Sequence, residues 1–249
     1  MSESFVTLDR KTINMRFPLP VLFLLLALKT FAQDKPAVTL PPPMIAVDSL
    51  YREDQFYVAA TYNRLLNKPA GVSENKFSSG FTGGFLRDMP INKRRTYAIA
   101  VGLGVSYNKY FQNLVVSKAD DVAQYNFIAT GTPYEKNKYE QLTVDVPIEF
   151  RWRTSTPESH KFWRIYTGVK LSYLAMGRAK YVDANYDITV TNNNDLNKFQ
   201  VGAYLTWGYN TWNFYGYYGL TSFYQSSAKV NNGSVGLNPL HLGLMFYIL

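Results

Sequence analysis

The chain has 249 residues, no cysteine and a formal charge of +8, and 16% of its residues are aromatic although its mean hydropathy is only −0.19. No run of about 18 apolar residues follows residue 32, which excludes a helical membrane protein. The positive charge suits anionic lipids or nucleic acid, but no basic helix or stacking platform accompanies it, so we expect no nucleic-acid partner.

The first 32 residues are predicted to be an upstream extension followed by a cleaved Sec-type signal peptide. Residues 1–14 are polar, so the true start is either Met1 or Met15. Arg16 supplies a positive charge, residues 17–28 form an apolar stretch, and Ala32 ends a short segment suited to cleavage. The apolar stretch is too short for a transmembrane helix. We therefore expect an exported protein.

The rest of the chain is predicted to form a proline-rich periplasmic lead, residues 33–54, and one barrel domain, residues 55–249. Alternating or aromatic-rich segments mark eight strands in the barrel domain. They cover residues 55–65, 77–86, 97–107, 139–153, 163–174, 199–209, 212–224 and 239–249. An even number of strands is expected for a single-chain bacterial barrel, and it returns both termini to the periplasm.

The clearest alternation lies between Tyr97 and Tyr107. One set of side chains is bulky and apolar with an aromatic at each end, whereas the interleaved set is small or polar. Because a strand has a period of two, these sets occupy opposite faces. Transmembrane strands need about 9–11 residues, with aromatics at the two interfaces, and this segment meets both requirements.

The connections alternate in length. Residues 87–95, 154–162 and 210–211 form short turns, whereas residues 112–138, 177–198 and 225–238 form long polar loops. Short periplasmic turns and long outer loops are the asymmetry of outer-membrane barrels. Eight strands leave an interior just wide enough for side chains. The sequence therefore predicts an all-β fold, an eight-stranded antiparallel transmembrane barrel of the bacterial outer membrane with a filled lumen.

Two stretches resemble a known family. Residues 48–57 (DSLYREDQFY) enter the first strand, and residues 85–95 (FLRDMPINKRR) form the first periplasmic turn. With the strand pattern, they make the chain similar to the PorT-like outer-membrane β-barrel family. The resemblance implies a role in the type IX secretion system, which exports adhesins, proteases and gliding components. It also implies other secretion proteins as partners, and it supplies no catalytic motif.

Four charged residues are predicted to face the lumen: Asp145, Glu149, Arg151 and Lys170. An unpaired buried charge is costly, so we expect an ion-pair network in which the two carboxylates face Arg151, Lys170 or Arg87. Such a network either only holds the barrel closed or takes part in transport, and the first reading is favoured.

A charged turn follows the second strand and contains Arg87, Asp88, Lys93, Arg94 and Arg95. It has two readings. Its basic residues either anchor the barrel among lipid headgroups, which ordinary membrane electrostatics favours, or form a periplasmic docking patch for machinery beneath the membrane.

The sequence predicts no enzyme, metal or cofactor. Its two histidines, His160 and His241, do not fall where a triad of an outer-leaflet acyltransferase would need them. Cysteine is absent and no pair of histidines has metal-ligand spacing. No small-molecule substrate is indicated, and outer-membrane lipids are the expected non-protein partners.

Three functions remain open on the sequence. The first is a non-enzymatic barrel that assists protein secretion, as a type IX component or assembly factor. The second is a structural or adhesive barrel whose outer loops bind ligands or surfaces. The third is a soluble lipocalin-like carrier with an apolar interior, which alternation alone does not separate from the others.

Overall fold

Eight antiparallel strands close into a barrel in the computed structural model, which describes residues 54–120, 122–154, 162–231 and 233–248. The barrel strands are β1 (Gln55–Leu66), β2 (Ser79–Pro90), β3 (Tyr97–Phe111), β6 (Lys136–Arg153), β7 (Trp163–Val182), β9 (Phe199–Tyr209), β10 (Trp212–Gly219) and β13 (Asn238–Ile248). Within the described residues no helix is long and apolar enough to cross a membrane. The predicted signal peptide and nearly all of the predicted lead lie outside those residues.

Neighbouring strands pair in sequence order, and β1 pairs with β13 to close the ring, with Phe56 opposite Ile248. The predicted eight-stranded antiparallel barrel is confirmed. The predicted two-residue hairpin is also present, because Trp212 pairs with Tyr209 across residues 210–211. The alternation predicted for residues 97–107 holds as well: Leu103 is 66% exposed on the outside, whereas Ala98 and Ala100 are fully buried inside.

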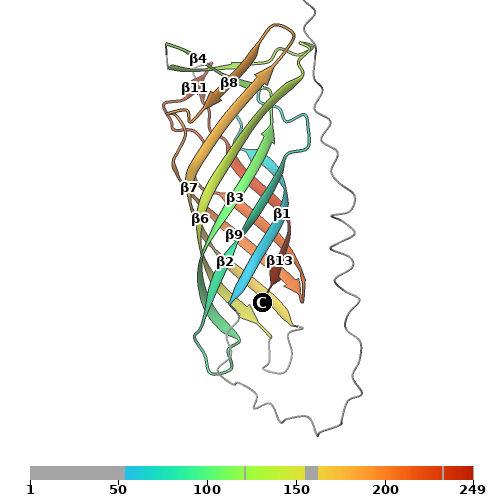
Figure 1. Cartoon of the computed structure of the whole chain (residues 1–249), viewed down its shortest axis with the longest axis vertical. Coiled ribbons are helices and arrows are strands. Elements are labelled where there is room, and N and C mark those ends of the chain that lie inside the picture. Colours follow the sequence, from blue (N-terminus) through green and yellow to red (C-terminus); the bar gives the residue numbers. More distant parts are fainter. Residues whose placement is uncertain (1–53, 121, 155–161, 232, 249) are drawn as a thin grey trace, which may run out of the picture. The chain divides into compact units, whose positions relative to one another are not determined.

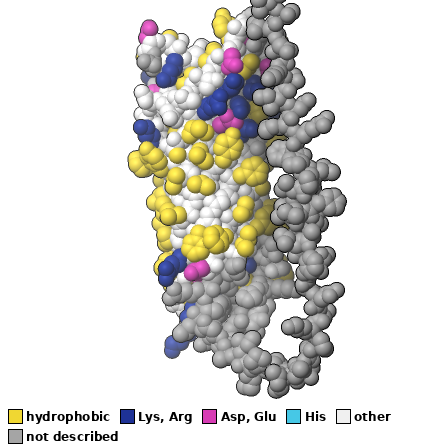
Figure 2. All heavy atoms as spheres, in the orientation of Figure 1, with side chains coloured by type: hydrophobic (Ala, Val, Ile, Leu, Met, Phe, Trp, Pro, Cys, Tyr) yellow, Lys and Arg dark blue, Asp and Glu magenta, His cyan; other side chains and the backbone are white. Residues whose placement is uncertain are grey.

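The outer wall is apolar and carries two belts of aromatic residues, one near each end of the barrel. Tyr62 stacks on Phe77 and Tyr173 contacts Phe199 near the end that bears the long connections. Near the other end Tyr97 stacks on Phe150, and Trp163 stacks on Trp207. Figure 2 shows hydrophobic side chains over the middle of the wall, with Lys and Arg gathered above them. An apolar exterior around charged side chains is the reverse of a soluble lipocalin-like carrier.

Glycines let one large lumen side chain lie flat across the inner wall. A Cβ on Gly104 would lie 2.2 Å from the hydroxyl of Tyr57, and one on Gly84 would lie 2.7 Å from the same atom. Both glycines occupy neighbouring positions of β2 and β3. Their lack of a side chain is what leaves space for the tyrosine ring in a barrel this narrow.

Several strand boundaries differ from the prediction. β2 continues to Pro90, because its pairing with β3 extends to Ala98. β7 continues to Val182, since it stays paired with β6 on one side up to Val182 and pairs with β8 on the other side from Arg178 onward. β10 ends at Gly219, not at residue 224, because Leu220 and Thr221 both donate their N–H groups to the carbonyl of Val201.

The long connections are not simple loops. They contain five short strands: β4 (Leu114–Ala119), β5 (Val122–Phe127), β8 (Asp187–Thr191), β11 (Lys229–Val230) and β12 (Gly233–Ser234). Apolar side chains from them pack with Tyr110 and Tyr139 of the barrel into a buried cluster that includes Val116, Leu196 and Tyr224. In Figure 1 these elements lie at one end of the barrel and the C-terminus at the other.

Candidate functional site

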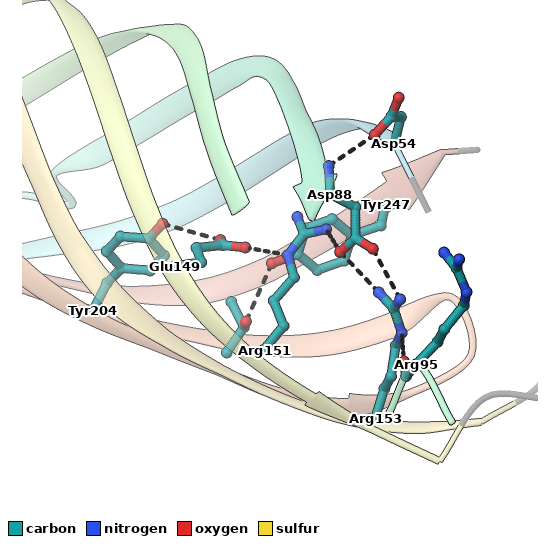
Figure 3. A network of polar contacts seen from close by, with 9 residues as sticks. Asp54, Asp88, Arg95, Glu149, Arg151, Arg153, Tyr204 and Tyr247 are labelled. Carbon is teal, nitrogen blue, oxygen red and sulfur yellow. Dashed lines mark hydrogen bonds and ion pairs between the residues drawn. The ribbon is translucent and has the colours of Figure 1, made fainter. Parts of the chain in front are cut away.

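The charged lumen is the candidate site, and its lower part is built around Asp88. Arg153 donates from Nη1 and Nη2 to the two Asp88 oxygens at 2.8 Å each, and Arg151 donates from Nη1 to Asp88 Oδ1 at 2.9 Å. All three side chains are fully buried. The backbone N–H of Asp88 donates in turn to Asp54 at 2.7 Å. Figure 3 shows the two guanidinium groups converging on this carboxylate.

Arg151 extends the network toward the middle of the barrel. Its Nε donates to Glu149 Oε2 at 2.8 Å, and the hydroxyl of Tyr204 donates to Glu149 Oε1 at 3.0 Å. The guanidinium carbon of Arg151 also lies 4.8 Å from the centre of the Tyr166 ring. The contacts of this one network of side chains therefore join four strands: β2, β6, β7 and β9.

A second cluster lies around Asp145. Its carboxylate accepts from Thr143 at 2.8 Å and from Ser106, and Lys170 Nζ lies 3.5 Å from it. The same ammonium lies 4.4 Å from the centre of the Tyr217 ring. Ser106 also contacts Thr82 at 2.8 Å, which joins the cluster to β2.

Toward the outer end, the polar contacts give way to aromatic ones. His241 Nε2 and the Tyr110 hydroxyl lie 2.7 Å apart, and the ring of Tyr217 stacks on His241 with centroids 4.8 Å apart. Tyr110 is also part of the buried cluster beneath the outer connections. The lumen is thus occupied by side chains from one end to the other.

Little space is left between these groups. The cavity bounded by Tyr57, Glu149, Lys170 and their neighbours has a volume of about 10 Å³. That is close to the minimum for a single water molecule. A filled interior is what the eight-strand geometry dictates. The arrangement joins strands and offers no passage for a solute.

The described residues offer no obvious catalytic chemistry. The polar contacts of His241 are with Tyr110, so no nucleophile and base stand together there. Among the described residues no group of three or more His, Asp or Glu side chains is close enough to hold a metal ion. His160 lies outside the described residues.

The structure places Asp145, Glu149, Arg151 and Lys170 inside the barrel, but in two clusters. Glu149 is bound to Arg151, and Asp145 is bound to Lys170. Arg87, the third cation offered as a partner of the two carboxylates, does not face the lumen, so that expectation was wrong. It is exposed on the outside, where its neighbours Phe85 and Met89 also point. The strand β2 continues past this position, and because successive side chains of a strand point to opposite faces, Arg87 points outward.

Asp88 also requires a correction, because the sequence placed it in an accessible turn. It is fully buried in the lumen, since β2 runs to Pro90 and Asp88 shares the inward face with Leu86. Arg95 lies at a turn with φ of 55°, and its carbonyl accepts from Arg153 Nε at 2.9 Å. Lys93 and Arg94 are exposed. Arg153 was not predicted to face the lumen, although it lies at every second position with Glu149 and Arg151 on the same face of β6.

A sequence model of a known family, described as outer membrane protein beta-barrel domain, matches residues 31–225. The chain belongs to this family. It is therefore an outer-membrane β-barrel protein. Barrels of this class carry their longer connections outside the cell, so we expect the end with the long connections to be the outer one. The resemblance to the PorT-like family was more specific than this match, which identifies the barrel family and not that branch.

No curated protein matches the chain. Among solved structures, the barrel is similar to Ail, the attachment invasion locus protein of Yersinia pestis, at 12% sequence identity and a TM-score of 0.35, over 79% of this chain and 100% of that one.

Proposed function

We propose that this outer-membrane barrel is a non-enzymatic protein that assists protein secretion, as a component or assembly factor of a type IX machine, and that it acts through its ends. The observation that carries the proposal is the filled lumen. Arg151, Arg153 and Glu149 are buried and bound within the barrel, so a substrate does not pass through it. What remains for a partner protein is the surface at each end.

The periplasmic end offers a fixed basic turn. Lys93 and Arg94 are exposed between β2 and β3, and Asn92 orders the turn by accepting the N–H of Tyr97 at 3.0 Å. The bond from Arg153 to the carbonyl of Arg95 ties the turn to the buried network. An ordered cationic turn suits docking to an acidic surface, because little conformational entropy is lost on binding. The link to type IX secretion comes from the PorT-like resemblance.

The first test is a clean deletion, with measurement of secreted proteins that carry type IX export signals. We expect those cargoes to be lost selectively, with total outer-membrane protein as control and restoration by the wild-type gene. Normal secretion in the deletion strain would overturn the proposal.

A second test separates docking from membrane anchoring. The double variant Lys93→Glu/Arg94→Glu reverses the exposed charges, and Lys93→Arg/Arg94→Lys conserves them. Docking predicts that only the reversed variant loses secretion while both reach the membrane at normal levels. Equal secretion by the two variants, with both present in the membrane at normal levels, would contradict docking. Loss of the barrel from the membrane in the reversed variant alone would indicate anchoring.

The second candidate function is a structural or adhesive barrel. Its support is the ordered outer end, where β4, β5 and β8 and their connections pack over the barrel. A fixed surface of this kind suits recognition of an external ligand. Normal secretion in the deletion strain together with weaker adherence to a surface would favour this candidate.

A further inference from the structure

A group of basic side chains lies on the outer wall where the barrel leaves the hydrocarbon layer. We call it the wall patch. It is carried by β3, β6 and β7, which are neighbours in the sheet. Its members are Lys109, Lys138, Arg178 and Lys180.

The height of the wall patch follows from the strand register. Tyr97 and Tyr107 bound the outward apolar face of β3, and their separation corresponds to about 25 Å of barrel height at a rise of about 3.3 Å per residue and a tilt of about 40°. That is the height of the apolar band of such barrels. Lys109 is the next outward residue, about 5 Å higher, within the headgroup layer, which extends roughly 5–8 Å beyond the hydrocarbon.

The strand register brings the cations together in two rows. Lys109 is opposite Glu140, which is opposite Arg178 on the next strand. One pleat higher, Lys138 is opposite Lys180. Paired residues on neighbouring strands lie within about 5.5 Å, so the four charges share one small area of wall. Figure 2 shows Lys and Arg side chains gathered above the apolar band on the visible face.

Glu140 holds part of this group in place. Its Oε1 accepts from Lys138 at 2.6 Å and from the Tyr107 hydroxyl at 2.7 Å, and Lys109 Nζ lies 3.8 Å away. Its side chain is only 7% exposed, whereas Lys109 retains 33% and Lys138 19%. The carboxylate is thus covered, and the ammonium groups are what the surface presents.

The wall patch has an excess of positive charge. Its four cations face two carboxylates, Glu140 and Asp187, the second of which pairs with Lys180 at 3.2 Å. Guanidinium and ammonium groups are the protein donors that match a phosphate.

We propose that the wall patch binds a phosphate group carried by a lipid of the outer leaflet. The lipid source follows from its position, because the row of Lys109 and Arg178 lies at headgroup height on the membrane-facing wall and the row of Lys138 and Lys180 lies directly above it, whereas a soluble phosphate would meet the outer connections first. The binding holds one phosphorylated lipid against β3, β6 and β7. This inference does not depend on the proposed secretion role.

The test uses the full-length barrel in phosphatidylcholine nanodiscs, with and without a phosphorylated glucosamine lipid (lipid A), and native mass spectrometry to count retained lipid. The patch variant is Arg178→Gln/Lys180→Gln, which leaves the bonds of Lys138 and Tyr107 to Glu140 intact. The matched control is Arg64→Gln/Lys229→Gln, which removes the same charge from exposed residues outside the patch. A shift in mobility on a denaturing gel between unboiled and boiled samples checks that the patch variant and the control variant both fold.

We expect the wild type and the control to retain the lipid, and the patch variant to bind it about thirtyfold more weakly for the loss of two interfacial cations. Dephosphorylated lipid should be retained no better by the wild type than by the patch variant. Equal retention of lipid A by the patch and control variants would overturn the proposal. Binding of inorganic phosphate alone, or its competition with the lipid, would also contradict a lipid source.

Discussion

Arg153 donates two hydrogen bonds to Asp88 although the residues lie 65 positions apart in the chain. Both oxygens of the carboxylate are engaged, and a guanidinium matches a carboxylate in this fork geometry. Arg151 shares the same carboxylate, so one anion serves two buried cations. Asp88 is therefore the residue on which the lower network depends.

Replacing that anion should destabilise the barrel strongly. Asp88→Asn leaves two buried guanidinium groups without their shared counter-charge, and breaking a buried pair costs about 3–5 kcal/mol. We expect the free energy of unfolding to fall by about that amount in a urea titration in lipid vesicles. Arg87→Gln, one residue earlier on the outside, is the control and should have no measurable effect. Identical unfolding midpoints for the two variants would contradict the assignment.

Glu149 and Arg151 should be energetically coupled. Glu149→Gln removes the negative charge that faces Arg151 Nε, and Arg151→Gln leaves Glu149 with Tyr204. Each single variant should lower the free energy of unfolding, and the double variant should lose about 1–3 kcal/mol less than the sum. Glu149→Gln combined with Lys180→Gln is the distant control, expected to be additive within about 0.5 kcal/mol. Additivity in the first pair would refute the coupling.

The strands and their faces could be predicted because alternation is local. The partner of Arg151 could not, because it depends on register across three strands. Asp88 is opposite Ala100 on β3, and Ala100 is opposite Glu149 on β6. The small side chain of Ala100 leaves room for the charged groups to meet over it. A strand boundary placed four residues too early, at Leu86, removed Asp88 from the lumen and concealed this arrangement.

Of the outer end, only the lengths of the connections could be predicted from the sequence. Leu196 and Val235 lie far from Tyr110 and Tyr139 in the chain, yet all four pack into one cluster. Such contacts are non-local and leave no periodic signal in short polar segments. The same limitation applies to the wall patch, because its rows form only when β3, β6 and β7 are in register.

The inner wall should not tolerate a methyl group at Gly168. A Cβ there would lie 2.1 Å from the carbonyl oxygen of Ile148, a backbone atom of β6 that is fixed by the pairing of β6 with β7. We expect Gly168→Ala to lower the free energy of unfolding by about 1–3 kcal/mol. Gly216→Ala is the control, since its nearest neighbour would be Leu242 Cδ2 at 3.7 Å. A loss no larger than that of the control would show that the strands adjust.

The filled lumen predicts that the purified barrel does not conduct ions. Lys170, Tyr217 and Glu149 occupy the space that a channel would need. In a planar lipid bilayer we expect no steady current after insertion, with a reconstituted porin as positive control. A current of uniform step size would contradict this reading and would favour a transport role for the lumen charges.

The turn after β7 should weaken in acid. Asp183 accepts from the Tyr181 hydroxyl at 2.7 Å and from the N–H groups of Asn185 and Tyr186 at 2.8 and 2.7 Å. The Tyr181 bond is the main cause that lowers the pKa of Asp183 below its ordinary 3.8, and this bond raises the pKa of Tyr181 to about 12.

A carboxylate with a depressed pKa stabilises the folded turn above its unfolded pKa, and this contribution is lost as pH falls through the folded value. We therefore expect hydrogen exchange at the amides of Asn185 and Tyr186, corrected for the intrinsic exchange rate, to lose protection below about pH 4. Asp183→Asn should flatten this dependence, because the amide does not titrate. Protection that is constant to pH 2, or an unchanged pH dependence in the variant, would show that Asp183 does not control the turn.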